Sequence, residues 1–506
     1  MGHFYVTTPI YYVNAAPHLG HAYTVIACDV LARHHRQRGE DVFFLTGTDE
    51  HGEPVADAAK ALGIEPKELA DRNAERFKAL MPRLEASNDF FIRTSDEKHK
   101  RRVQEVLQRV HDNGYTHLGM YEGWYCPRCA DFKVENEIGP DNTCPIHEIP
   151  LVREQEENWF FNLSAFHERL EQLYAEQPDF VQPQSRRNEA LSFIKSGLQD
   201  VSLSRAKLTW GVEVPWDPGH VFYVWFDALL NYYTALGYAR PDEDLTDRFW
   251  PATYHVIGKD ILKFHTVFWP AMLMAAELAL PEHVFVHGFL LGGDGRKMSK
   301  SLGNVLDPFE AMDTYGVDAL RYYLSRDVQF GADGSVSMES LAARYEGELA
   351  NELGNLASRS IAMLRRYRDG QVPDGALDLA DEFAGLDDDV ARRLDNADLT
   401  GALDAIWQRV RRLNRYVEEQ APWTLAKDES RSGDLDRVLR TLAEGVRALT
   451  VLLWPWIPGS AERLLTALDR VDVAYAKARF GADVPDTAAE LEPLFPKDRP
   501  AAPAGS

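Results

Sequence analysis

Residues 4–33, FYVTTPIYYVNAAPHLGHAYTVIACDVLAR, decide the fold class of this chain. An apolar, β-branched run ends at Pro9, and apolar residues at helical spacing follow the turn Pro17-His18-Leu19-Gly20-His21. This order predicts a strand, a turn and a helix whose N-terminus faces a ligand. His18 and His21 are three residues apart, so a helix beginning here places both imidazoles on one face. Such a face suits nucleotide phosphates, although two surface histidines on an ordinary first helix would give the same pattern.

A second stretch, far downstream, carries two lysines on a glycine-rich loop. Residues 292–296 are rich in turn-forming types, and Lys297-Met298-Ser299-Lys300-Ser301 follows directly. Two lysines on such a loop can move onto a triphosphate and neutralise the charge that develops on leaving pyrophosphate. An exposed basic turn is the simpler interpretation, but the presence of both elements in this order favours a phosphate-handling site.

Length and composition place the chain among large globular proteins. Its 506 residues are 45% hydrophobic and 11% aromatic, which suffices for about two to four domains with large cores. The longest apolar stretch, residues 266–280, is interrupted by Pro270 and Glu277 and is too short to span a bilayer. No signal peptide is recognisable, so we expect a cytoplasmic protein without membrane association. The formal charge of −24 argues against a general nucleic-acid coat protein but permits docking of RNA on local basic patches.

Three of the four cysteines lie within one short segment. Cys126-Pro127-Arg128-Cys129 and Cys144-Pro145-Ile146-His147 form two pairs with the spacing of a metal knuckle. Cys126, Cys129, Cys144 and His147 would fill a tetrahedral site and leave no open position, which favours one structural zinc ion over a catalytic one. Two reduced Cys-Pro turns without metal are the alternative.

Alternating strand and helix patterns predict an α/β fold. Residues 41–46 read as a buried strand followed by the polar turn Thr48-Asp49-Glu50-His51-Gly52. Polar groups at the carboxyl ends of parallel strands are where doubly wound sheets bind ligands. Residues 221–225 and 284–286 are further predicted strands, residues 254–260 a strand leading into a turn, and the chain beyond Ser301 is mostly helical in pattern. We therefore predict a doubly wound, Rossmann-like parallel-sheet catalytic domain with a zinc-knuckle insertion and a C-terminal α-helical bundle.

Domain boundaries are predicted where these patterns change. The predicted segments are the first half of the catalytic nucleotide-binding domain (1–114), the insertion with the knuckle (115–222), the second catalytic half (223–296), the lysine loop with a linking region (297–347), the helical domain (348–480) and a loosely ordered tail (481–506). The tail is assigned from its content of proline, alanine and acidic residues.

The two signatures resemble those of the class I aminoacyl-tRNA synthetases. His18-Leu19-Gly20-His21 is similar to the first signature of that class, with leucine where isoleucine is commonest, and residues 297–301 match the second letter for letter. Within the class, nearly the whole chain apart from the tail most resembles the methionyl-tRNA synthetase family. The resembling segments are residues 9–12, 48–52, 224–228, 255–260, 264–265 and 421–423. The knuckle resembles the single-metal form of the family.

This resemblance implies a two-step reaction. Methionine and ATP with Mg²⁺ would give methionyl-adenylate and pyrophosphate, and the 3′-terminal adenosine of tRNA(Met) would then accept the methionyl group. No protein nucleophile is required, so positioning and charge neutralisation would carry catalysis. Methionine, ATP and tRNA(Met) are the implied partners. We expect a monomer, since no C-terminal dimerisation module is recognisable.

The resemblance also implies roles for individual residues. The catalytic residues would be His18, His21, Lys297 and Lys300, and ATP binding would add Gly20, Gly258 and Asp260. The methionine pocket would comprise Ile10, Tyr12, Asp49, Trp225, Ala228, Tyr232, Ile261, Phe264 and His265, with Asp49 holding the α-ammonium group and aromatic walls suited to a thioether. The anticodon would be read by Asn351, Asn355, Arg359, Pro422 and Trp423. By pattern alone, the aromatic helix around His265 is more typical of a core, and the polar stripe from Asn351 is typical of a solvated helix face.

Three alternatives were weighed against this interpretation. A cysteinyl-tRNA synthetase shares both signatures, but its zinc ligands do not form a compact paired knuckle. A small-molecule nucleotidyltransferase with a His-x-Gly-His turn would not need a helical domain. An inactive tRNA-binding or scaffolding paralogue would keep the fold, yet such proteins tend to lose the histidines or lysines, and both sets are intact here.

Overall fold

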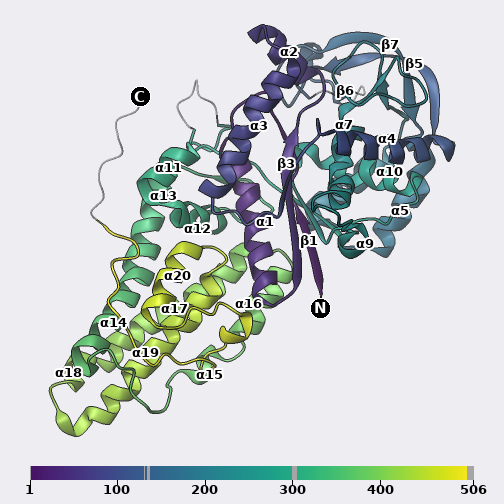
Figure 1. Ribbon diagram of the computed structural model, residues 1–506. Helices are drawn as coiled ribbons and strands as arrows, with labels where there is room; N and C mark the ends of the chain where they lie inside the picture. The colour runs from purple at the N-terminus through teal and green to yellow at the C-terminus, as the bar shows by residue number, and fades with distance from the viewer. Residues whose placement is uncertain (1, 130, 134–136, 299–304, 498–506) are drawn as a thin grey trace.

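The computed structural model describes residues 2–129, 131–133, 137–298 and 305–497. Figure 1 shows an α/β lobe built on a parallel sheet, with the insertion at its upper right, and a bundle of helices from the C-terminal part of the chain at the lower left. Within the described residues, no helix has the length and apolar character needed to cross a membrane.

The main sheet has seven strands, all parallel, in the order β2-β3-β1-β12-β13-β8, with β4 also paired to β3. The strands are β1 (His3–Thr7), β2 (Tyr11–Tyr12), β3 (Asp41–Asp49), β4 (Phe90–Arg93), β8 (Val181–Gln182), β12 (Tyr254–Gly258) and β13 (His283–His287). The chain steps outward from β1 to β3 and β4, and later outward the other way from β12 to β13. The order therefore reverses between β1 and β12, and doubly wound sheets bind ligands at the carboxyl ends beside such a switch point.

Both faces of the sheet are buried. On β1, Phe4 and Val6 join the core beneath α1 (Leu19–Gln37), whereas Tyr5 points into a second core. Burial on both sides explains why these strands read as nearly continuous apolar runs in the sequence. The other helices of this lobe are α2 (Glu53–Leu62), α3 (Pro66–Arg83), α4 (Glu97–Asp112), α7 (Val224–Leu229), α8 (Asn231–Thr234), α9 (Thr246–Phe249) and α10 (Trp269–Ala275), with short 3-10 turns η4 (Ala235–Gly237) and η5 (Lys259–Ile261) and the π-helix η6 (Phe264–Phe268). The predicted doubly wound fold is confirmed.

The insertion forms an antiparallel sheet in the order β6-β5-β7-β9. Its elements are β5 (Thr116–Cys126), β6 (Asp131–Lys133), β7 (Val152–Phe161), β9 (Val201–Ser202), η2 (Pro140–Asn142), η3 (Leu163–Phe166), α5 (His167–Glu176) and α6 (Gln184–Lys195). β8 comes from within the span assigned to the insertion, yet it pairs with β13 as an edge of the main sheet. Residues 221–225 do not extend the main sheet as expected. β11 (Val221–Phe222) pairs with β10 (Ser204–Arg205), and α7 begins at Val224, so Trp225 lies on a helix.

The helical bundle follows the lysine loop. Its elements are α11 (Pro308–Tyr315), α12 (Val317–Asp327), α13 (Met338–Arg344), the π-helix η8 (Tyr345–Gly354), α14 (Asn355–Arg368), α15 (Ala380–Phe383), α16 (Leu386–Asp395), α17 (Leu399–Gln420), α18 (Pro422–Leu425), η9 (Glu429–Arg431), α19 (Ser432–Leu453), α20 (Pro458–Ala467) and η10 (Tyr475–Lys477). A strand that precedes the lysine loop, β14 (Leu290–Leu291), pairs with β15 (Gly334–Ser335), which lies between α12 and α13. α17 buries one apolar stripe, as its sequence period predicts, whereas α19 is buried on all sides from Thr441 to Leu453 as the central helix of the bundle. α17 ends at Ala421, which has a left-handed φ of 42°, and Pro422 then starts α18 in a new direction.

The prediction of a loosely ordered tail from residue 481 is wrong for its described part. The Ala488 N–H donates to the Gly370 carbonyl at 2.7 Å, and the Val372 N–H donates to the Asp486 carbonyl at 2.9 Å. Leu494 and Phe495 are buried against the bundle. Two apolar side chains and a few backbone hydrogen bonds thus anchor a segment whose composition suggested disorder. Residues 498–506 lie outside the described residues.

Candidate active site and metal centre

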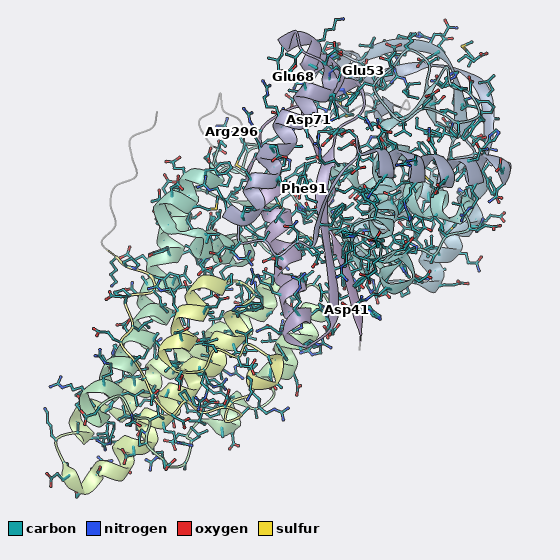
Figure 2. All side chains as sticks on the ribbon, viewed as in Figure 1. Asp41, Glu53, Glu68, Asp71, Phe91 and Arg296 are labelled. Atoms are coloured by element: carbon teal, nitrogen blue, oxygen red, sulfur yellow. The ribbon has the colours of Figure 1, made fainter. Side chains whose placement is uncertain are left out.

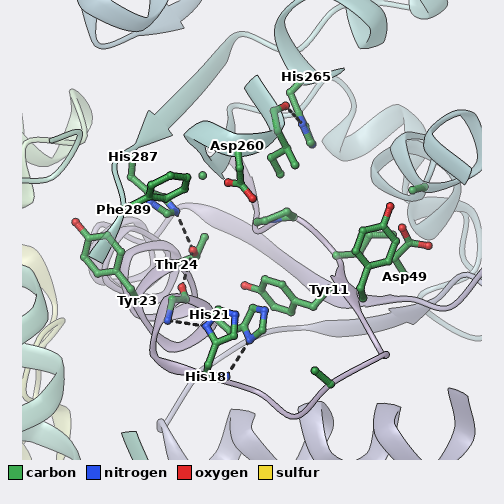
Figure 3. Close-up of a pocket in the computed structure, with 18 of the residues that line it drawn as sticks. Tyr11, His18, His21, Tyr23, Thr24, Asp49, Asp260, His265, His287 and Phe289 are labelled. Atoms are coloured by element: carbon green, nitrogen blue, oxygen red, sulfur yellow. Dashed lines mark hydrogen bonds between the residues drawn. The ribbon is translucent and has the colours of Figure 1, made fainter. Parts of the chain in front are cut away.

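A cavity of about 360 Å³ opens at the carboxyl ends of β1 and β12, beside the switch point (Figure 3). Most of the residues predicted for ATP and methionine line it: Ile10, Tyr12, His18, Gly20, His21, Asp49, Trp225, Ala228, Tyr232, Gly258, Asp260, Ile261 and His265. Figure 3 shows Asp49 on one side of the cavity, His287 and Phe289 on the other, and His18 and His21 together between them. We call the side with Asp49 the acidic end and the side with His287 and Phe289, near which Asp260 also lies, the ring-lined end.

His18 and His21 cap the helix α1 reciprocally. The Gly20 N–H donates to His18 Nδ1 at 3.1 Å, and the His18 N–H donates to His21 Nδ1 at 3.0 Å. An Nδ1 that accepts carries no proton, so the N–H of each neutral ring is at Nε2. Burial lowers the pKa of both rings, and the neighbouring His18 lowers that of His21 further, while Asp260 opposes the shift at His18. Both rings therefore present neutral Nε2–H donors at pH 7.

Two glycines leave room for neighbouring side chains of the cavity. A Cβ on Gly20 would lie 3.0 Å from the His18 ring, so glycine leaves the capping ring in place. A Cβ on Gly258 would lie 2.6 Å from Asp260 Oδ1, a clash with the carboxylate that lines the cavity. Both positions thus protect the orientation of a polar side chain.

Aromatic side chains form the wall of the acidic end. Trp225 and Phe264 stack at 3.8 Å between ring centroids with an angle of 6° between planes. Phe264 does not line the cavity; it supports Trp225 from behind. His265 Nδ1–H donates to the Ile261 carbonyl at 3.1 Å, so its Nε2 accepts from the Tyr232 hydroxyl at 2.7 Å. Burial lowers the pKa of His265 to about 4, which keeps this ring neutral.

Asp49, the last residue of β3, is a buried carboxylate in need of a cation. No described residue gives its Oδ1 a hydrogen bond. Burial, and then the charge of Asp227, raise the pKa of Asp49 well above its ordinary value. A carboxylate buried without a counter-charge is costly, so the site favours a ligand that brings an ammonium group.

Of the two lysines in the second signature, Lys297 is among the described residues. Lys297 does not line the cavity; its Nζ donates to the Ile146 carbonyl in the knuckle at 3.3 Å. Lys300 lies outside the described residues. Arg296, at the turn that precedes Lys297, is at the outer edge of the molecule (Figure 2).

The predicted anticodon residues lie on the bundle. Asn351 in η8 and Asn355 at the start of α14 are exposed. The Arg359 guanidinium lies 5.7 Å from the ring centroid of Trp423 and donates to Glu418 Oε1 at 2.8 Å. Pro422 is buried at the start of α18 and is not available to a base. Figure 1 shows α18 at the end of the bundle remote from the main sheet.

The four predicted metal ligands come together. Their ligand atoms all lie within 4.8 Å of one another, with Cys129 Sγ 3.6 Å from Cys144 Sγ and His147 Nδ1 3.3, 3.8 and 3.9 Å from the three sulfurs. A tetrahedral zinc ion with bonds of about 2.3 Å to sulfur and 2.0 Å to nitrogen separates its ligands by roughly 3.5–3.8 Å. The Cys129 N–H also donates to Cys126 Sγ at 3.4 Å, which supports a thiolate there. The residues fit zinc, and none of them lines the cavity.

Several cavity residues were missed from the sequence. Thr24 Oγ1 and His287 Nε2 lie 2.9 Å apart, which ties α1 to the end of β13. Tyr11, Tyr23, Phe289 and Leu290 also line the cavity. The only sequence signal was indirect, since His287 and Gly288 directly follow a predicted strand and such positions lie at a ligand-binding edge.

Comparisons with known proteins agree with this geometry. A family model described as tRNA synthetases class I (M) matches residues 4–151 and 141–361. The methionine--tRNA ligase of Caldanaerobacter subterraneus subsp. tengcongensis is 45% identical over 503 residues, 98% of this chain and 78% of that protein. That of Streptomyces coelicolor is 47% identical over 482 residues, 92% of this chain and 89% of that protein.

Solved structures show the same relationship. The Mycobacterium tuberculosis methionyl-tRNA synthetase in complex with methionyl-adenylate has a TM-score of 0.93 at 41% identity and covers 98% of this chain and 100% of its own. The free-state form of that enzyme has a TM-score of 0.87 at 38% identity, with 99% of each chain covered.

Metal content tests the knuckle. Purified protein should contain about one zinc ion per chain, and Cys129→Ser should lose it and loosen the insertion, because ligand geometry and folding are coupled. Cys28→Ala is the matched control, since Cys28 is a buried thiol of α1 outside the cluster. Elemental analysis and limited proteolysis provide the readouts. Active, chelator-free protein without any metal would favour two reduced Cys-Pro turns.

The unmet charge of Asp49 predicts a stability effect with a defined sign. Because the folded state raises the pKa of Asp49, the folded protein holds this proton more tightly than the unfolded chain does. The free energy of unfolding therefore falls as pH rises from the ordinary value of 3.8 through the raised pKa. Asp49→Asn removes this loss, so its melting midpoint relative to the parent should be higher at pH 7.5 than at pH 4.5 by about 2 °C or more. Thermal melts between these values provide the check, and a difference independent of pH would contradict it.

Proposed function

The chain belongs to the class I methionyl-tRNA synthetase family, and from this premise we propose how its residues carry out the reaction of a methionine--tRNA ligase. The activity itself follows from the family: L-methionine is activated with ATP and transferred to its cognate tRNA. The assignment of residues rests on the cavity. There the buried Asp49 carboxylate, whose Oδ1 has no hydrogen-bond partner among the described residues, lies in the same cavity as the aromatic side chains of Trp225 and Tyr232.

Methionine would bind at the acidic end of the cavity. Asp49 would receive the α-ammonium group, which satisfies the Oδ1 that no described residue pairs. The thioether would lie against Trp225 and Tyr232, because sulfur makes favourable contacts with aromatic rings. Ile10, Tyr12, Ala228, Ile261 and His265 would close the slot, and Phe264 would hold the Trp225 ring in place from behind.

ATP, with Mg²⁺, would lie across the switch point. The Nε2–H groups of His18 and His21 would donate to its phosphates, and Asp260 would accept from a ribose hydroxyl. The glycines Gly20 and Gly258 would keep these side chains oriented. Lys297 and Lys300 would neutralise the pyrophosphate, with Lys297 exchanging its hydrogen bond to the Ile146 carbonyl for the phosphate oxygens. The ring-lined end, with His287 and Phe289, would take the base.

The two steps then need no protein nucleophile. A carboxylate oxygen of methionine would attack the α-phosphorus of ATP, the bond from that phosphorus to the bridging oxygen would break, and pyrophosphate would leave. A ribose hydroxyl of the 3′-terminal adenosine of tRNA(Met) would next attack the methionyl carbonyl carbon, AMP would leave with the bonding electron pair, and the hydroxyl proton would pass to a phosphate oxygen of the leaving AMP. Preorganised donors would stabilise the charge that develops on the phosphate oxygens.

The proposal also assigns the parts of the chain. Residues 1–114 and 223–296 would form the catalytic domain, 115–222 the insertion with one structural zinc ion, 297–347 the lysine loop and link, and 348–480 the anticodon-binding domain. The separation of the knuckle from the cavity supports a structural metal and disfavours a cysteine-specific enzyme with zinc in its pocket. We propose a cytoplasmic monomer, which light scattering on the full chain would check.

Exchange of pyrophosphate into ATP tests the phosphate site. His21→Ala should lower methionine-dependent exchange by roughly 10²-fold or more, as for other preorganised donors. His21→Asn is the informative partner, because an Asn oxygen can accept from the His18 N–H and keep the cap, yet offers no donor where Nε2–H was. Both variants should lose methionine-dependent exchange, whereas the melting temperature of His21→Asn should stay close to that of the parent protein. Near-normal exchange by His21→Asn would refute the assignment.

The bundle is tested by measuring activation and charging on the same preparation. Arg359→Ala and Trp423→Ala should leave methionine-dependent exchange intact and reduce tRNA charging, since stacking is worth roughly 1–3 kcal/mol per base. Arg365→Ala is the matched control, because Arg365 lies on the same helix but pairs with Glu490 of the tail. A solvated helix face predicts equal charging by the Arg359 and Arg365 variants, and that result would end the anticodon assignment.

A further inference from the structure

A cluster of buried ionisable groups lies directly behind the methionine end of the cavity and has no part in the reaction above. Asp227 Oδ2 is 2.6 Å from His51 Nδ1, and Asp227 Oδ1 is 2.7 Å from His99 Nε2. All three side chains are at most 1% exposed. None of the three lines the cavity.

The hydrogen bonds fix the direction of each contact. Burial alone would raise the pKa of Asp227, but the charge and hydrogen bonds of His51, together with those of His99, hold it at about 2. Asp227 is therefore an anion that accepts at both oxygens. His51 donates from Nδ1–H and His99 donates from Nε2–H, and Thr234 Oγ1 lies 2.7 Å from His99 Nδ1.

The cluster joins parts of the chain that meet only in the folded protein. Asp227 lies on α7, which also carries Trp225 and Ala228 into the cavity. His51 follows the end of β3 and is two residues beyond Asp49. Asp227 therefore comes from the part of the chain after the insertion, and His51 comes from the part before it. Asp227 thus links the aromatic wall to the strand end that bears the carboxylate.

The turn after β3 makes further hydrogen bonds to other elements, and the Gly52 backbone packs against Val224 of α7. Arg93 donates to both oxygens of Glu50 at 2.7 and 2.9 Å, and the Glu50 N–H donates to Thr94 Oγ1 at 2.9 Å. Trp210 Nε1–H donates to the Glu50 carbonyl at 2.5 Å. These contacts tie the turn to β4 and to the end of the insertion. Among the hydrogen bonds of the described residues, the pair between His51 and Asp227 is the one that reaches α7.

We propose that Asp227, held by His51 and His99, is a positioning residue that sets the spacing between Asp49 and the Trp225 wall. The inference rests on the proposed function of this cavity. Stability alone does not require such a cluster, because well-packed apolar side chains at a buried ionic site are often as stable or more so. What hydrogen bonds add is one orientation of α7 relative to β3. Asp227 also acts on Asp49 through its charge. This charge raises the pKa of Asp49 and so disfavours its ionised form until an ammonium group binds.

A matched pair at His99 tests the proposal, because His99 lies on α4 outside the cavity. His99→Leu removes the donor to Asp227, and we expect it to raise the KM for methionine about tenfold while the KM for ATP stays within about twofold. His99→Gln can place an amide N–H near the position of Nε2 and should restore the KM for methionine to within about threefold of the parent. Both constants are measured by pyrophosphate exchange in the full chain.

Asp227→Asn adds a readout that a purely structural role would not move. Asp49 faces Asp227, Glu50 and Tyr232, of which Asp227 is the larger charge effect on its pKa. Removal of the Asp227 charge should lower the pKa of Asp49, so the acid limb of kcat/KM for methionine should move to lower pH. This variant keeps the side-chain shape and decides the matter if His99→Leu does not fold.

The outcomes are distinct. A lower melting temperature with both KM values unchanged, or equal rises in both, would overturn the positioning role while the parent remains active. An unshifted acid limb in Asp227→Asn with an unchanged methionine KM would do the same. A parent protein without methionine-dependent exchange would overturn the proposed function and this inference with it.

Discussion

The buried ion pair between Asp29 and Arg321 joins the α/β lobe to the helical bundle, and the placement of the cavity relative to the bundle depends on the geometry it fixes. Arg321 NH2 lies 2.7 Å from Asp29 Oδ2, and both side chains are 0% exposed. The same guanidinium donates to the carbonyls of Leu84, Pro455 and Trp456 at 2.7–3.1 Å. A buried pair of this kind is tolerated because its remaining donors are satisfied. Since α1 begins at the two histidines of the cavity and carries Asp29, the pair orients that cavity relative to the bundle.

Local sequence predicted what local interactions determine. The first strand, turn and helix were recognisable because the apolar run, the proline and the helical period all lie within thirty residues. The knuckle was recognisable because its ligands come in two close pairs. The strands β4 and β8 were not, since they have four and two residues and exist only through partners far along the chain. Residues 221–225 were assigned as a strand from their apolar run, yet α7 begins among them, because a short apolar run does not distinguish a strand from a buried helix.

In the cavity, too, the sequence identified residues within local motifs but not the long-range contacts that hold them. Asp49, Trp225 and the histidines were found through motifs, and the motifs could not reveal how those groups are held. The neutral state of His18 and His21 follows from a reciprocal cap and from burial, neither of which is visible in a four-residue signature. Thr24 and His287 are 263 positions apart and meet through topology alone. Phe264 was expected as a pocket residue, and in the structure it stacks on Trp225 and does not itself line the cavity.

The chemistry of recognition explains why such a cavity requires a rigid surround. The ammonium group that Asp49 would bind is common to all amino acids, so this contact supplies affinity without selecting methionine. Selection must come from the fit of an unbranched thioether against the rings, and one methylene in an apolar slot is worth only about 1–3 kcal/mol of discrimination. Such a margin survives only if the rings cannot adjust to another side chain. At the acidic end, Asp49 lacks a counter-charge until the ammonium group of the substrate binds, and this contact supplies affinity. The buried hydrogen bonds of Asp227 would hold the aromatic wall in one orientation, and this rigidity would supply selection.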